Sequence, residues 1–193
     1  MRCEQSALKS LSATSPVPRM SRVPWKGCQR MYFGMSVSAP YLEATVTAAA
    51  VARERGDLEV LVNISQMTVS QMSLTEMTDS PQQRQHWLGE QVLNWSGLPV
   101  VHVRATVFLQ NFFFLAWAAE SIARDATIRL PFGTGRTSPV DARDVAEAVT
   151  TLLTSPTAHI GKVYELTGPR SQDTWSNTAP REARTPTSAP RRG

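Results

Sequence analysis

The sequence predicts an α/β fold in which a partial parallel sheet is flanked by helices and the chain ends in disordered tails. In the middle of the chain, short β-rich apolar runs alternate with longer amphipathic segments, and the links between them are short. The chain has 193 residues, of which 41% are hydrophobic and 19% charged, as in one globular domain. We expect a tail at 1–30, a domain at 31–170 and a basic tail at 171–193.

The first helix is expected between Ser38 and Gly56. Ser38 can cap it, Pro40 suits the first turn, and Gly56 suits the position just past the end. One set of its residues is spaced three or four apart, as on one face of a helix: Leu42, Val46, Ala49, Ala50 and Arg53. A buried strand follows at Leu58–Ile64, and 65–80 is expected to be a polar loop.

A second helix is expected from Ser80 and Pro81 to Gly97. Its apolar residues predict a buried stripe of Trp87, Leu88, Val92 and Trp95. The later expected elements are a strand at Pro99–Val103, a helix at about 110–124, a strand at Thr127–Leu130, a helix at 142–154 and a strand at Lys162–Leu166. Asp141 is expected to cap the helix at 142–154, with Asp144 in its first turn. Capping explains these two carboxylates better than a metal site does.

The net charge of +4 is not a nucleic-acid signal, because it belongs to the two ends. Residues 1–30 carry +5 and residues 170–193 carry +3, whereas the middle carries −4. Basic tails attract phosphate without selecting a sequence, so we expect no specific nucleic-acid partner. Both ends are rich in Pro, Ser and Arg and show no apolar period, which predicts disorder.

Membrane and secreted classes are not favoured by the sequence. The longest apolar run, Phe112–Ala119, is far shorter than the roughly 20 residues that span a bilayer, and the N-terminus has no apolar signal core. Cys3 and Cys28 form neither a disulfide framework nor a metal cluster. We therefore expect a cytoplasmic protein that is not bound to a membrane.

Several segments together resemble the NmrA-like branch of the atypical short-chain dehydrogenases. They are YLEATVTAAAVARERG, LEVLVNISQ, QHWLGEQVLNWSGLPVVHVRATVFLQNFF, PFGTGRTSPVDARDVAEAV and HIGKVYELTGP, and they occur in the order that this family has. The resemblance covers about residues 32–170. It implies a Rossmann-like domain that binds NADP or NAD, with a strand at about Met31–Ser36 as the fourth of the family's sheet.

The Gly-rich half of that family fold is not found in the sequence. The cofactor pyrophosphate normally lies on a G-x-x-G-x-x-G turn after the first strand, and the chain contains no such motif. Gly133 and Gly135 follow a strand late in the chain. We therefore expect a truncated or divergent member of the family that binds NADPH poorly.

The resemblance implies a nicotinamide end built from six residues. Ser65 has the place of the catalytic Ser of short-chain dehydrogenases, and Gln66 would face the same crevice. The other four match the family's RPxxFxxN segment: Arg104, Thr106, Phe108 and Asn111. The alternative for Ser65 is a loop-starting serine that bonds the local backbone.

His86 and Glu90 occupy the positions of the family's Tyr-x-x-x-Lys pair, although neither matches by type. Their four-residue spacing puts them on one helix face. His86 could serve as an acid or base, or it could be a surface histidine paired with Glu90. Three other candidates have structural explanations: His102 is expected to be a satisfied core or edge histidine, Tyr164 a packing residue, and Phe112–Phe114 core or interface.

Three functions stay open at this stage. A sensor would bind oxidised and reduced NAD(P) differently and pass this to a protein partner. A reductase would transfer hydride to a small organic substrate, and a remnant would do neither. The absent Tyr-Lys pair favours the sensor. We also expect self-association, because the strand at 31–36 would have an unpaired outer edge and its faces and those of Val60–Ile64 would be exposed.

Overall fold

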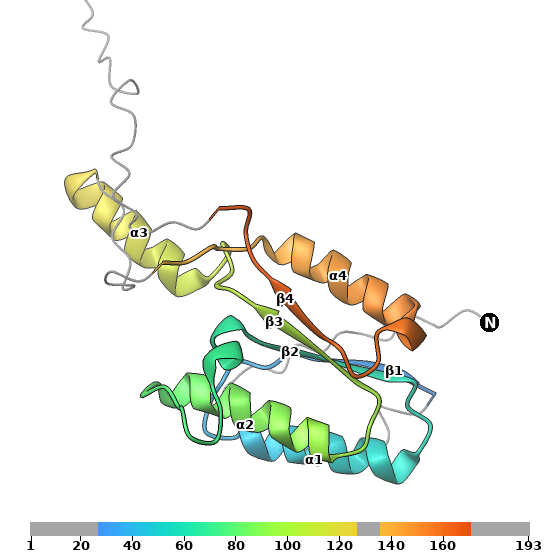
Figure 1. Ribbon diagram of the computed structural model, residues 1–193. Coiled ribbons are helices and arrows are strands. Elements are labelled where there is room, and N and C mark those ends of the chain that lie inside the picture. Colours follow the sequence, from blue (N-terminus) through green and yellow to red (C-terminus); the bar gives the residue numbers. More distant parts are fainter. Residues whose placement is uncertain (1–26, 127–135, 171–193) are drawn as a thin grey trace, which may run out of the picture. The chain divides into compact units, whose positions relative to one another are not determined.

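The α/β prediction is confirmed by the computed structural model, which describes residues 27–126 and 136–170 (Figure 1). Residues 1–26 of the tail expected at 1–30, the tail expected at 171–193 and the strand expected at 127–130 lie outside the described residues. The described elements follow in the order β1 (Arg30–Phe33), α1 (Tyr41–Arg55), β2 (Val60–Gln66), the short helix η2 (Met67–Gln71), α2 (Pro81–Trp95), β3 (Val100–Ala105), α3 (Phe112–Asp125), α4 (Ala142–Thr154), η3 (Pro156–Ala158) and β4 (Val163–Leu166).

The chain divides into two compact units. Within the described residues, the first contains 27–104 and 149–165, and the second contains 105–126, 136–148 and 166–170. The division falls near the ends of β3 and β4 and within α4. Each unit is described by itself below.

The sheet has the strand order β1-β2-β3-β4. β1 pairs with β2 in parallel, with Met31 opposite Leu61 and Phe33 opposite Asn63. The strands begin and end within three residues of the predicted positions, and β1 starts at Arg30, which the sequence placed in the tail. Parallel strands of this kind need helical crossovers, and α1 and α2 supply two of them.

Helix α1 ends as predicted but begins differently. Gly56 follows it with a φ of 69°, the left-handed conformation that glycine adopts at little cost. The prediction that Ser38 caps the helix is wrong, because Pro40 occupies the capping position and no side chain caps it. Of the predicted face only Ala49 is buried, and Val46 is half exposed. The buried residues of α1 are Tyr41, Thr45, Ala48, Ala49 and Ala52.

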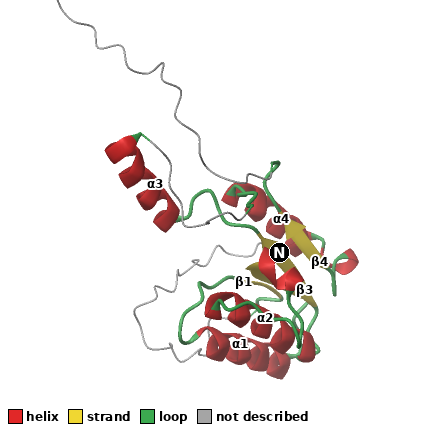
Figure 2. Ribbon diagram, turned by 60° about the vertical axis from the view of Figure 1, so that its left-hand side comes forward, coloured by secondary structure: helices red, strands yellow, loops and turns green. Residues whose placement is uncertain are grey.

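Small residues explain which face of α1 is buried. Helices α1 and α2 lie side by side on one face of the sheet, as Figures 1 and 2 show, and the alanines of α1 allow close contact. At Gly89 of α2, a β-carbon would lie 3.1 Å from the Tyr41 ring. The buried face of α1 is thus set by the close packing of the Tyr41 ring against the backbone of α2, and not by the spacing of its large apolar residues.

Helix α2 begins as predicted, but three of the four residues that were predicted to form its buried stripe are not buried. The Ser80 hydroxyl accepts a hydrogen bond from the Gln83 backbone N–H, and Pro81 opens the helix. Of the predicted stripe only Trp87 is buried, whereas Leu88 is exposed and Trp95 is 75% exposed. The buried face carries Gly89, Glu90 and Leu93, because Glu90 forms an internal ion pair there.

The expectation of an exposed apolar face at Val60–Ile64 is wrong. Val60, Leu61 and Val62 have no exposed surface. Leu61 packs in a cluster with Ala49, Leu93 and Val100. At the neighbouring strand, the Arg30 guanidinium donates to the carbonyls of Leu153 and Thr154, so the end of α4 returns to this unit. Within the described residues β1 remains an edge strand of the sheet, as expected.

The second unit holds α3, the first half of α4 and the segment that follows β3. The predicted cap is confirmed, since the Asp141 carboxylate accepts a hydrogen bond of 2.7 Å from the Arg143 N–H and Asp144 lies in the first turn. Gly168 donates its N–H to the Ser138 carbonyl, and a β-carbon at Gly168 would overlap the backbone carbonyl of Pro139. This contact requires glycine. The side chains of Phe112–Phe114 lie outside the described part.

In the part of the chain that the structure describes, no helix combines the length and the apolar character that crossing a membrane requires. The same residues contain no cluster of three or more His, Cys, Asp or Glu that could hold a metal ion.

Candidate functional site

The end of β2 places a buried serine at the edge of the sheet where ligands of open α/β folds lie. Ser65 is 6% exposed, and its hydroxyl has no hydrogen-bond partner in the described structure. Because side chains alternate along a strand, Ser65 shares the face of Leu61 and Asn63, which α1 and α2 cover. A backbone-bonding role for this serine is therefore wrong, since no such bond forms.

More unpartnered polar atoms follow Ser65 in the chain. The Oε1 of Gln66 and the Oγ1 of Thr68 are both buried and without a partner, and so is the Oε1 of Gln85 near the start of α2. A buried polar atom without a partner costs free energy, about 1–3 kcal/mol for a neutral group. Such atoms are explained most simply by a ligand or water that supplies the missing hydrogen bonds.

His86 lies on α2 and contacts Tyr41 at the start of α1. The Tyr41 hydroxyl is 3.2 Å from His86 Nδ1, and the two rings meet edge to face at 5.3 Å between centroids. Burial, with a smaller effect of the Glu90 carboxylate, raises the pKa of Tyr41 to about 12, so its phenol keeps its proton. Burial lowers the pKa of His86, although Glu90 opposes this. The Tyr41 hydroxyl and His86 Nδ1 therefore share a hydrogen bond between a neutral phenol and a ring whose neutral form is favoured, and the imidazole tautomer sets its direction.

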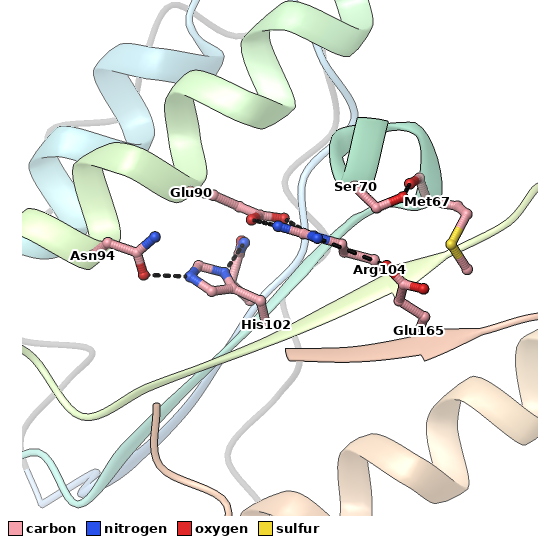
Figure 3. A network of polar contacts seen from close by, with 8 residues as sticks. Met67, Ser70, Glu90, Asn94, His102, Arg104 and Glu165 are labelled. Carbon is pink, nitrogen blue, oxygen red and sulfur yellow. Dashed lines mark hydrogen bonds and ion pairs between the residues drawn. The ribbon is translucent and has the colours of Figure 1, made fainter. Parts of the chain in front are cut away.

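The interpretation of Glu90 as a surface partner of His86 is wrong. Glu90 is 1% exposed and forms a two-point ion pair with Arg104 of β3, at 3.0 Å to Nε and 2.7 Å to Nη2 (Figure 3). A third group, the Glu165 carboxylate of β4, lies 3.7 Å from Arg104 Nη1. Arg104 thus joins α2, β3 and β4, and its role in cofactor binding stays a prediction.

His102 is a satisfied core histidine, as predicted. It is 4% exposed, and its Nε2 lies 2.9 Å from the Asn94 amide oxygen (Figure 3). Its Nδ1 lies 3.0 Å from the Asn63 amide nitrogen. Burial lowers its pKa and so favours the neutral ring. Tyr164 is likewise a packing residue, because its hydroxyl lies 2.6 Å from His159 Nδ1.

The other three predicted residues belong to the second unit. The Thr106 hydroxyl donates to the Ser138 carbonyl, and the Thr106 N–H donates to the Leu166 carbonyl. Phe108 forms a parallel bridge with Val140, and the Asn111 N–H donates to the Phe108 carbonyl. These contacts fold the segment after β3 into a turn that precedes α3. The structure thus places Ser65, Gln66, His86 and Arg104 in the first unit and these three in the second.

Sequence reasoning missed Tyr41, Asn63 and Asn94. Tyr41 is the first residue of α1. The helix was predicted to begin earlier, so the sequence did not mark Tyr41 as a residue of its buried face. Asn63 is a polar residue in the middle of an apolar strand. Such a residue needs a buried partner, and that signal could have pointed to His102.

The described residues suit the nicotinamide end of a dinucleotide but not its pyrophosphate. Ser65 and Gln66 offer unpartnered polar atoms that suit a carboxamide or a ribose hydroxyl. A pyrophosphate needs clustered backbone N–H groups at a glycine turn, and the link from β1 to α1 contains only Gly34. A β-carbon at Gly34 would also overlap the Tyr32 ring, so this glycine serves local packing.

Two curated reductases are similar to the chain in sequence. It is 37% identical over 95 residues to an NAD(P)H azoreductase of Xenophilus azovorans, a match that covers 48% of this chain and 32% of the relative. It is 32% identical over 137 residues to a (4-alkanoyl-5-oxo-2,5-dihydrofuran-3-yl)methyl phosphate reductase of Streptomyces griseus, covering 71% of this chain and 44% of the relative. The chain thus spans less than half the length of these relatives. No protein-family profile matches it.

Solved structures share the fold. The triphenylmethane reductase of a Citrobacter species, complexed with NADP(H), superposes with a TM-score of 0.64 at 16% identity over 79% of this chain and 51% of that one. Nucleotide-sugar epimerases have the same fold. The chain therefore has the Rossmann-like fold that these solved structures share. Both curated sequence relatives are reductases, and the name of the Xenophilus relative specifies NAD(P)H.

Proposed function

We propose that the chain forms the substrate side of an NAD(P)H-dependent reductase of the NmrA-like kind that acts on a small organic molecule. The observation that carries the proposal is Ser65, which is buried and unpartnered at the carboxyl end of β2. The sequence likeness to two reductases supports the same assignment.

The chain's own residues can do three things in such a site. Ser65 and Gln66 can hydrogen-bond a nicotinamide carboxamide or a substrate carbonyl. His86 can donate from Nε2 in the tautomer in which Tyr41 donates to Nδ1. The bound cofactor would supply hydride, and the Glu90–Arg104 pair would hold α2, and with it His86, against β3. No residue of the described part supplies a pyrophosphate cradle.

A redox sensor is the second candidate. At the positions of the family's Tyr-Lys pair the chain has His86 and Glu90, and the Glu90 carboxylate is committed to Arg104. Neither a phenol nor an ammonium group stands at these two positions. The nearby phenol of Tyr41 is no substitute, because burial raises its pKa to about 12. A protein that binds NAD(P) without turning it over would tolerate this arrangement.

Turnover separates the two candidates. The full chain is incubated with millimolar NADPH and with a panel of quinones and azo compounds, and hydride transfer is followed by the loss of NADPH absorbance and by mass spectrometry of the reduced product. Transfer that Ser65→Ala reduces at least about ten-fold, a typical effect of removing one polar group at a reacting centre, supports the reductase. No transfer, together with different affinities for NADP⁺ and NADPH, supports the sensor.

A further inference from the structure

A hollow of about 410 Å³ lies in the first unit, beside the end of β2. It is formed by the segment that links β2 to α2 in Figure 1, and by the first turn of α2. Its lining consists of three threonines, two glutamines, two methionines and one glutamate, all between Thr68 and Gln83. A volume of this size suits a small organic molecule.

The lining contains one charged group, and it is negative. The Glu76 carboxylate forms no ion pair within the described part of the chain, and neither Lys nor Arg lines the hollow. Phosphate and carboxylate ligands are held by Arg, Lys or clustered N–H groups. The chemistry of the lining therefore disfavours an anion and favours a cation or a neutral hydrogen-bond donor.

The start of α2 does not reverse this preference. A helix N-terminus attracts anions through its free N–H groups. Here Pro81 has no N–H, and the Gln83 N–H already donates to the Ser80 hydroxyl. Few donors of the first turn are thus left for an anion.

Two features of the lining favour an aromatic ligand with a donor group. Met72 and Met77 line the hollow, and thioether sulfur makes favourable contacts with aromatic rings. Thr68 supplies a buried Oγ1 that has no partner in the described structure. Its hydroxyl could accept a hydrogen bond from a ligand N–H group.

We propose that this hollow binds an aromatic amine or an aromatic cation. Calling that molecule a substrate rests on the proposed function, whereas the binding itself does not. The proposal also separates this chain from its Streptomyces relative, whose name specifies a phosphate ester. An anionic group of that kind would face Glu76 with no cation in the lining to offset the repulsion.

The test uses three probes of nearly equal shape and different charge: 4-aminobenzamidine, 4-aminobenzamide and 4-aminobenzoate. Each is titrated into the full chain, without NAD(P)H, and followed by chemical shifts in ¹H–¹⁵N NMR spectra. We expect the cation to bind at least about five-fold more tightly than the anion, as one exposed carboxylate allows, with shift changes among residues 68–83.

Variants of the lining make the test specific. Glu76→Gln should reduce the cation-to-anion ratio toward one, and Met77→Gln should weaken all three probes together. Glu43→Gln, a matched change at an exposed position of α1, should alter neither the cation-to-anion ratio nor the affinity for the probes. The proposal is overturned if the anion binds as tightly as the cation, if Glu76→Gln leaves the ratio unchanged, or if the shifts fall outside the hollow. Because no cofactor is present, a chain that binds the cation but transfers no hydride refutes the reductase and leaves this site standing.

Discussion

The ion pair between Glu90 and Arg104 should be the largest single polar contribution to the stability of the first unit. Removing one partner of a fully buried pair costs about 3–5 kcal/mol, because the other charge is left uncompensated. Glu90 is 1% exposed, but Arg104 keeps 19% of its side chain in solvent and has Glu165 at 3.7 Å. We therefore expect Glu90→Leu to lower the free energy of unfolding by about 2–3 kcal/mol, below the fully buried range.

Urea unfolding followed by circular dichroism measures this loss. The matched control is Glu59→Gln, which removes an equally short ion pair to Arg30 whose side chains are 44% and 42% exposed. Its cost should stay below about 1 kcal/mol. The double variant Glu90→Leu/Arg104→Leu should be more stable than Glu90→Leu alone, since it removes the stranded charge. A cost for Glu90→Leu no larger than that of Glu59→Gln would refute the reasoning.

Three further outcomes follow from the structure. Burial lowers the pKa of His86 and His102 below the ordinary 6.5, so the unfolded chain binds protons at a higher pH than the folded chain. The free energy of unfolding should therefore be constant above pH 6.5 and fall below it. His102→Gln should reduce the difference between the free energies of unfolding measured in urea at pH 7.5 and at pH 5.5; an unchanged difference would contradict this. Tyr41→Phe removes a donor from neutral His86 and should cost about 1 kcal/mol and raise the pKa of His86 in an NMR titration, whereas a fall in that pKa would show that Tyr41 is not the donor. The edge strand β1 should support self-association, so light scattering should show a dimer that Tyr32→Lys weakens; a wild-type monomer at high concentration would argue against it.

The order of elements could be predicted from the sequence because each is marked by local chemistry. Pro81 after Ser80 and Gly56 at a positive φ act within a few residues of the helix ends that they define. Asp141 is a similar local signal, and its capping bond is present. Such signals need no knowledge of the rest of the chain.

The buried faces of the helices could not be predicted in the same way. The sequence favoured Trp95 and Val46 as core residues, but both are exposed, and Glu90 is buried instead. A carboxylate enters a core only when a distant residue neutralises it, and Arg104 lies fourteen positions away on another element. The pairing of Tyr41 with His86 depends in the same way on how α1 meets α2. The place of Ser65 at a strand end could be predicted because it is a local feature, whereas its missing partner is a property of the packed structure.

The most direct test of the central claim compares reduced nicotinamide mononucleotide with NADPH. Both are titrated into the ¹⁵N-labelled chain, with Ser65→Ala in parallel. If the chain offers the nicotinamide end of a reductase site without a pyrophosphate cradle, both should shift the Ser65 and Gln66 amide signals, and NADPH should bind at millimolar concentrations, within about ten-fold of the mononucleotide. Micromolar binding of NADPH would show that a cradle exists, and an absence of shifts at Ser65 and Gln66 would contradict the proposed site.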